Sequence, residues 1–302
     1  MVAPIISAPE RASFRRRELE SRPSSAGPAV APDLDQAVRA ALAIYYYPGM
    51  WDWDRGVRLP LVRQGLDRAV DQLGAGGDTA ESARRDGRAL LARYCDWAPE
   101  VDRFAPVLVE TDFDVPLPDS QRPGSGLVTA GGAAVRYQDR VDLLAVDEHD
   151  DYWIVYHRLT GGDWASPAEL AADEEALAAC WAWEQFYLGM AITGTIFNEL
   201  QVQAHGEKVP RRRWSRRGAA PPGPVVRQHE PSGGGRSLGQ RQRRSARAAG
   251  PGRRAPVEQV TGPGFRRSWL RRTPDEVAAA GRRLAADAAA MIASGFQPGD
   301  GG

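Results

Sequence analysis

The sequence predicts an α/β protein in which a mixed sheet is flanked by helices. Apolar residues recur at helical spacing through residues 34–98, and polar and apolar residues alternate from Ala105 onward. A strongly capped helical segment that begins at Ser166 separates the third predicted strand from a fourth. The order is therefore helices, three strands, a helix and one more strand, which predicts an α/β core over residues 34–205.

The first part of this core is predicted to be helical. Residues 34–46 carry an apolar stripe at helical spacing, and the stripe stops at Pro48, which is followed by glycine. Residues 59–73 and 79–98 restore the same period. We therefore expect three helices before the first strand.

Three strands follow the helices. Residues 106–117 alternate, which predicts one face with Val107, Val109, Thr111, Phe113 and Val115 and a solvated face with Glu110, Asp112 and Asp114. Residues 134–146 and 152–159 are rich in β-branched and aromatic residues and are joined by five polar residues, as in a hairpin. Residues 192–203 predict the last strand of the core.

Two helices carry complete start signals. One spans residues 166–190, with Ser166 as cap and Glu169 closing a capping box, and its aromatic side chains are expected to pack in the core. The other spans residues 273–296, where Thr273 and Glu276 form the same motif. Its apolar stripe predicts that it docks on the core, and consists of Val277, Leu284, Met291 and Ile292.

The remaining segments have no apolar period. Residues 1–33 are rich in Pro, Ser, Ala and Arg and predict a disordered leader, and residues 206–272 predict a disordered basic linker. The net charge of the whole chain is zero, but it is unevenly divided: residues 1–208 carry a net charge of −13 and residues 209–272 a net charge of +15. The basic segment could bind DNA or another polyanion. It could also be a solvated linker that pairs with the acidic core, or the product of a GC-rich gene read out of frame.

Composition excludes several classes of protein. The two cysteines, Cys95 and Cys180, have no metal-binding or disulfide spacing, so we expect buried free thiols. No run of 18 apolar residues and no signal peptide are present, which predicts a cytoplasmic protein without membrane contact. The only lysine is Lys208, so almost all positive charge is arginine.

The hairpin at residues 140–160 carries the residues with chemical potential. Asp142 lies on its first strand, and strand alternation predicts that Tyr156 and Arg158 share one face of the second, with His157 on the other. A magnesium-dependent phosphodiesterase needs carboxylates for the ion and a nearby cation for the phosphate. Asp142 and Arg158 could supply one of each. Alternatively, they could form a cross-strand ion pair in place of a metal.

The order of strands and the motif "RVDLL … WIVYHRLT" resemble the PD-(D/E)XK nuclease superfamily, in its RecB-like exonuclease branch, over about residues 105–200. The resemblance implies a restriction-endonuclease-like core in which Asp142 holds Mg²⁺ or Mn²⁺, with Glu110 as a weaker match to a second ligand. Tyr156 stands where the family has a carboxylate, and Arg158 where it has a lysine. The cysteine cluster that closes some members is missing, so no iron–sulfur cluster is expected.

These residues give two hypotheses. The first is a nuclease-like, DNA-associated protein with weak or lost metal-dependent phosphodiesterase activity and a degenerate catalytic set of Asp142, Tyr156 and Arg158. The second is a non-catalytic binding or scaffold module that retains the nuclease fold. A protein partner is not predicted.

Overall fold

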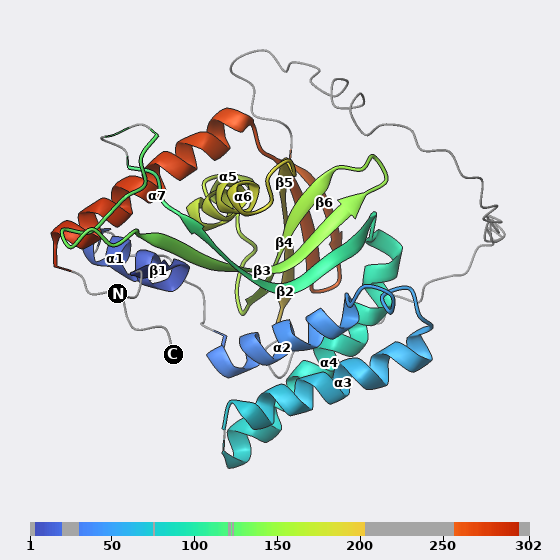
Figure 1. Cartoon of the computed structure of the whole chain (residues 1–302). Coiled ribbons are helices and arrows are strands. Elements are labelled where there is room, and N and C mark those ends of the chain that lie inside the picture. The colour runs from blue at the N-terminus through green and yellow to red at the C-terminus, as the bar shows by residue number, and fades with distance from the viewer. Residues whose placement is uncertain are drawn as a thin grey trace. The chain divides into compact units, whose positions relative to one another are not determined.

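A computed structural model describes residues 4–19, 30–74, 76–119, 122, 124–202 and 257–295. Its centre is a seven-stranded mixed sheet flanked by helices, as the sequence predicts (Figure 1). The helices are α1 (Ala8–Leu19), α2 (Pro32–Tyr45), α3 (Arg55–Gln72), α4 (Gly77–Val101), α5 (Pro167–Ala171), α6 (Glu174–Phe186) and α7 (Pro274–Ala293). The strands are β1 (Ile5–Ser7), β2 (Phe104–Pro116), β3 (Arg136–Asp147), β4 (Tyr152–Thr160), β5 (Ile192–Gln201), β6 (Glu258–Gly262) and β7 (Phe265–Arg271).

The chain order of the core is the predicted one. After α4, strands β2, β3 and β4 form an antiparallel meander, and the chain then crosses through α5 and α6 to β5, which is parallel to β4. β7 and β6 continue the sheet as antiparallel strands, and β1 pairs in parallel with β3. Parallel neighbours need a crossover connection, which α5 and α6 provide here.

Each face of the sheet has its own hydrophobic core. The cluster that contains the buried side chains of α2, α3 and α4 lies on one face, together with Leu143 and Val155 of the hairpin. The cluster that contains α6 and α7 lies on the other, together with Leu144 and Ile154. Figure 1 shows the two groups of helices on opposite sides of the sheet. None of the helices in the described ranges is both long and apolar enough to cross a membrane.

The prediction of a disordered leader over residues 1–33 is wrong for residues 5–19, which form β1 and α1. Ile6 is fully buried, and Arg11 donates to the Asp287 carboxylate of α7 at 2.7 Å. β1 has only three residues, and pairing with the far end of β3 holds it in place. These contacts join residues that are remote in the sequence, so no local pattern shows them. Residues 20–29 lie outside the described part.

The predicted basic linker over residues 206–272 also ends too late. Residues 258–271 form the hairpin of β6 and β7, and Phe265 and Leu270 are buried. This hairpin was not predicted from the sequence because its arginines make the segment highly charged, and a highly charged segment predicts no buried core. The buried guanidinium of Arg266 pairs with Glu199 of β5, which is equally buried. The rest of that prediction, for residues 206–256, falls outside the described residues.

The helix predicted over residues 166–190 is two helices. α5 begins with the predicted capping box of Ser166 and Glu169 but ends at Ala171, and Asp173 then caps α6 by accepting from the N–H of Ala176. The C-terminal helix is confirmed with its capping box. Its buried stripe, which docks it on the core, includes Val277, Leu284 and Met291.

Candidate functional site

The hairpin strands β3 and β4 separate at the position of the predicted site. Their paired ladder ends at Leu143 and Val155, and β4 continues alongside β5 alone. N–H groups on the open edge of β4 then need other acceptors. Asp142 Oδ2 accepts from the N–H of His157 at 2.8 Å, and Asp35 of α2 accepts from the N–H of Leu159 at 3.4 Å. Two carboxylates therefore take the place of a neighbouring strand.

The other carboxylate oxygen of Asp142 is directed toward α2. This atom, Oδ1, lies 3.7 Å from the guanidinium of Arg39, and only 14% of the side chain is exposed. Burial raises the pKa of Asp142, and the Arg39 charge and the His157 N–H oppose that shift. Asp142 does not share a face with Leu144, as regular strand alternation would require, because Leu144 packs in the α6 cluster. The strand alternation breaks where the two strands part.

Tyr156 is a packing residue in this structure. Its side chain is 8% exposed, and its ring stacks on Phe197 of β5 with centroids 5.9 Å apart. The hydroxyl has no hydrogen-bond partner among the described residues. Burial raises the pKa of Tyr156 well above its ordinary value, so the phenol stays neutral and cannot replace a carboxylate as a metal ligand.

Arg158 has a partner other than the predicted one. It donates to Asp173, the cap of α6, at 2.6 Å and lies over the ring of Phe197 at 4.3 Å. The predicted ion pair between Asp142 and Arg158 is therefore wrong. Arg158 is directed toward the α6 face, whereas Asp142 is directed toward the edge of β4 and α2.

Glu110 lies opposite Asp142 in the register of β2 and β3. The pairs on either side, Val109 with Leu143 and Thr111 with Val141, are both formed, but the ladder skips Glu110 itself. Its backbone is left-handed, with a φ of 41°, a conformation that non-glycine residues rarely adopt.

This irregularity and a register shift between Pro106 and Leu108 reverse the alternation of β2. Val109 consequently packs toward α2 and α3, while Phe113 packs toward α6. The predicted single apolar face of β2 is thus wrong. Glu110 lies beside Val109 in the lining of a pocket on the α2 and α3 side, which is described below.

The predicted magnesium site, Asp142 with Glu110, stays a prediction. Asp142 caps β4 and faces α2, and Glu110 lies on the same side, where its charge helps to raise the pKa of Asp142. Within the described ranges, no group of three or more His, Cys, Asp or Glu side chains is placed to hold a metal. No catalytic step through a metal is derived for these residues.

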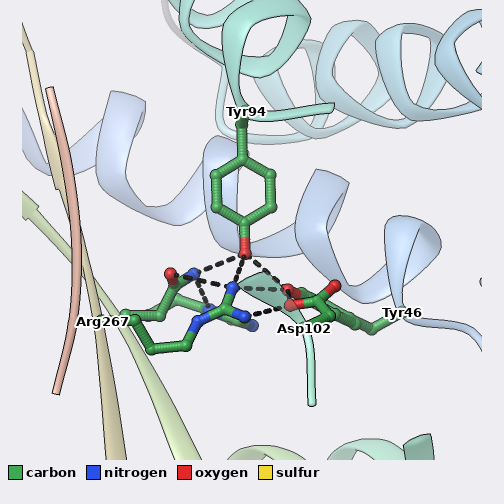
Figure 2. Close-up of polar contacts among 6 residues, drawn as sticks. Tyr46, Tyr94, Asp102 and Arg267 are labelled. Atoms are coloured by element: carbon green, nitrogen blue, oxygen red, sulfur yellow. Dashed lines mark hydrogen bonds and ion pairs between the residues drawn. The ribbon is translucent and has the colours of Figure 1, made fainter. Parts of the chain in front are cut away.

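A second polar system, which the sequence did not reveal, lies beside the hairpin inside the protein (Figure 2). Arg267 of β7 has a fully buried side chain and forms an ion pair with Asp102, the residue that caps the end of α4. Its guanidinium also donates to the hydroxyls of Tyr46 and Tyr94, both at 2.9 Å. Burial alone would lower the pKa of Arg267, but the surrounding phenols and the Asp102 carboxylate raise it above its ordinary value.

The hydrogen bonds of this network run in one direction. Asn198 Nδ2 donates to Tyr94 Oη at 2.8 Å, the Tyr94 and Tyr46 hydroxyls are 2.6 Å apart, and Tyr46 donates to Asp102 at 3.1 Å. Tyr94 extends from α4 with its hydroxyl over the guanidinium of Arg267 (Figure 2). The carboxylate of Asp102 is therefore the acceptor on which the chain ends. Chains of this kind polarise each of their bonds.

His157 connects this network with the hairpin. Its N–H caps onto Asp142, while its ring stacks on Tyr46 and its Nδ1 lies 2.9 Å from Asn198 Nδ2. Asn198 Oδ1 accepts from Arg267, so the amide nitrogen faces the imidazole, and Nδ1 is the acceptor. Burial, with Arg267 and Arg39 nearby, lowers the pKa of His157 to about 3. At neutral pH His157 is therefore an uncharged, buried structural residue.

The fold and this site define a mixed α/β protein whose hairpin residues act mainly in packing. No family model and no curated protein match the chain. Among solved structures, it is similar to the one described as "Crystal structure of SSO0001", with 10% identity over 63% of this chain and 70% of that chain and a TM-score of 0.26. A TM-score this low supports no inference about function.

Proposed function

We propose that this protein is a non-catalytic, DNA-associated binding module built on a core that resembles PD-(D/E)XK nucleases. The resemblance is supported by the order of α4, β2, β3, β4, α6 and β5. The loss of catalysis is supported by the hairpin, where Asp142, Tyr156 and Arg158 all serve the fold. The single observation that carries the proposal is how Asp142 is held: Oδ2 accepts from the His157 N–H and Oδ1 lies 3.7 Å from the Arg39 guanidinium, so a donor and a cation already compensate the carboxylate.

Hydrolysis of a phosphodiester requires charges that face the substrate in an accessible site. Arg158 donates to Asp173 through Nη2, and a phosphate that took this donor would leave the Asp173 cap of α6 without its charge partner. Tyr156 is buried against Phe197 and offers no negative charge. The same three positions that would make a nuclease therefore stabilise the sheet and the start of α6.

DNA association is supported by the arginine-rich segment, which lies outside the described residues. Its composition alone bears on the proposal: residues 209–256 contain 13 arginines and one acidic residue, Glu230. The predicted linker extended to residue 272 and so included four more arginines. These four lie in β7 or directly after it, and Arg266 and Arg267 among them are buried. Contacts from arginine to phosphate would be independent of base sequence and sensitive to salt.

We expect no cleavage of single- or double-stranded DNA by the full chain with Mg²⁺ or Mn²⁺, even at high protein concentration. Asp142→Asn is expected to leave this baseline unchanged. Labelled oligonucleotides resolved on a denaturing gel are the measurement. Metal-dependent turnover that Asp142→Asn abolishes would refute the absence of catalysis.

Restoring the family residues tests the same point from the opposite direction. Tyr156→Asp combined with Arg158→Lys is expected to bind no Mn²⁺ by calorimetry and to lower the thermal midpoint, because it buries a carboxylate beside Phe197. Arg158→Lys alone is the matched control, since it keeps the charge next to Asp173. If the double variant binds Mn²⁺ and the control does not, the hairpin still has room for a metal ion and lacks only the ligating side chains.

The DNA association is tested by neutralising the arginine-rich segment. A variant with all 13 arginines of residues 209–256 changed to glutamine keeps the length and leaves the β6–β7 hairpin untouched. For the unmodified chain, we expect the logarithm of the association constant to fall with the logarithm of salt concentration by about 0.9 per phosphate contacted on duplex DNA. The glutamine variant should lose most of this slope in fluorescence anisotropy titrations. Equal slopes for both proteins would exclude the segment as the DNA contact.

A further inference from the structure

A pocket of about 300 Å³ lies between α2, α3 and β2. One face of α3 contributes to it at the spacing i, i+3, i+4 and i+7, and one face of α2 at i, i+3 and i+4, with Tyr47 just beyond the end of that helix. Its apolar surface is formed by Ala40, Ala43, Ile44, Ala69 and Val109. A Cβ at Gly65 would lie 2.1 Å from Ile44 Cδ1, so this glycine lets the two helices approach closely beside the pocket.

Two opposite charges line the same pocket without neutralising each other. Glu110 of β2 is half-buried and Arg68 of α3 is exposed, and neither forms a hydrogen bond or an ion pair with another described residue. Tyr47, which follows α2, adds a phenol ring that is 53% exposed. An apolar surface with a free carboxylate and a free guanidinium is typical of a site in which few polar groups orient a small ligand.

The backbone at Glu110 provides independent support. Its left-handed φ of 41° costs free energy for any side chain other than glycine, and it interrupts the ladder between β2 and β3. Nothing within the described residues compensates the Glu110 carboxylate by binding it. A ligand bound in the pocket would give the Glu110 carboxylate a partner that the described residues do not supply.

We propose that this pocket binds a small zwitterion of the α-amino-acid type with an apolar side chain. The ligand ammonium would meet Glu110, the ligand carboxylate would meet Arg68, and the apolar side chain would contact Ile44 and Val109 against the ring of Tyr47. The volume is at the lower end of the range for ligand pockets, which favours a single amino acid over a peptide or nucleotide. An inorganic cation or anion would use one of the two charges and leave the apolar surface in water.

The test uses the full chain and three related probes. L-Phenylalanine carries both charges, phenethylamine lacks the carboxylate, and 3-phenylpropionate lacks the ammonium. We expect saturable binding of phenylalanine by calorimetry or NMR titration with a Kd of about 1 mM or tighter, the range set by about 12 heavy atoms. Each truncated probe should bind about tenfold more weakly. Absence of saturable binding of phenylalanine, or equal binding of all three probes, would overturn the proposal.

Substitutions assign each charge to its group. Glu110→Gln should weaken the binding of phenylalanine and phenethylamine by about tenfold and leave that of 3-phenylpropionate unchanged. Arg68→Gln should weaken the binding of phenylalanine and 3-phenylpropionate and leave that of phenethylamine unchanged. Arg63→Gln, an exposed arginine on the same helix that does not line the pocket, is the matched control. Glu110→Gly should abolish the phenylalanine preference while preserving or raising the thermal midpoint, because glycine tolerates the backbone conformation. Affinities that no substitution changes would place the ligand elsewhere and overturn the assignment.

Discussion

Replacing Arg267 with methionine is expected to lower the free energy of unfolding by about 3–5 kcal/mol, the usual cost of removing one partner from a buried ion pair. Methionine fills a similar volume but leaves Asp102 buried without its counter-charge. Tyr46, Tyr94 and Asn198 also lose a donor. The effect is large because one guanidinium joins β7 to α2, α4 and β5.

Urea unfolding at pH 7 measures this cost, and the chain contains a matched control. Arg271 lies on the same strand, is more than half exposed, and pairs with Asp151 at 3.1 Å. Arg271→Met is expected to cost about 0–1 kcal/mol, as exposed ion pairs do. If Arg267→Met costs no more than Arg271→Met, the buried network does not hold the hairpin to the core.

The double variant Asp102→Leu with Arg267→Met provides a further check on the ion pair. Removing both charges eliminates the buried orphan carboxylate, so we expect it to recover part of the stability that Arg267→Met loses. A double variant that is as unstable as the sum of its single variants would show that the two side chains act independently.

The second large expected effect is a pH dependence of stability from Asp139 of β3. Burial raises the pKa of Asp139 to about 7, and the Glu175 and Asp142 carboxylates act in the same direction. The N–H of Arg140 at 2.8 Å and the hydroxyl of Tyr137 at 3.0 Å oppose the shift. The unfolded chain releases this proton near pH 4, its ordinary pKa.

Between about pH 4 and pH 7 the folded protein therefore holds a proton that the unfolded chain has lost. Stability from this group is fully present below pH 4 and falls as the pH rises from 4 to 7. The difference between pKa values of about 4 and about 7 corresponds to at most about 4 kcal/mol, which the partial exposure of Asp139 reduces. Asp139→Asn keeps the neutral form at every pH, so we expect it to be more stable than the unmodified protein at pH 8 and similar at pH 4.

Chemical denaturation from pH 4 to pH 8 tests this dependence. Asp112→Asn removes an exposed carboxylate on the adjacent strand β2 and controls for the change in net charge. If the stability curves of Asp139→Asn and the unmodified protein run parallel over this range, Asp139 does not carry the dependence.

Local patterns predicted most of the core. Helical spacing located α2, α3 and α4, runs rich in β-branched and aromatic residues located β3 and β4, and the predicted last strand corresponds to β5. The capping boxes at Ser166 and Thr273 placed the starts of α5 and α7 correctly, because each bond joins residues three apart. Alternation failed on β2, where Glu110 adopts a conformation that its residue type does not favour.

The candidate site was predicted less well, for a physical reason that Asp142 illustrates. The sequence identified this aspartate and its spacing to Tyr156 and Arg158, but the choice between a metal ligand, an ion pair and a strand cap depends on where β4 leaves β3. That separation follows from the pairing of β4 with β5. The partner of Arg158 was likewise fixed by the position of α6.

The sequence by itself determined the order of helices and strands, the helix caps and the unequal division of charge, since all of these arise from neighbours along the chain. Only the tertiary structure decided the roles of the charged residues. Arg267 reads as one arginine of a basic segment, yet it is fully buried because Asp102, two tyrosines and Asn198 surround it from elements up to 221 residues away. A buried charge is tolerated only when such partners converge, and that convergence is a property of the folded chain.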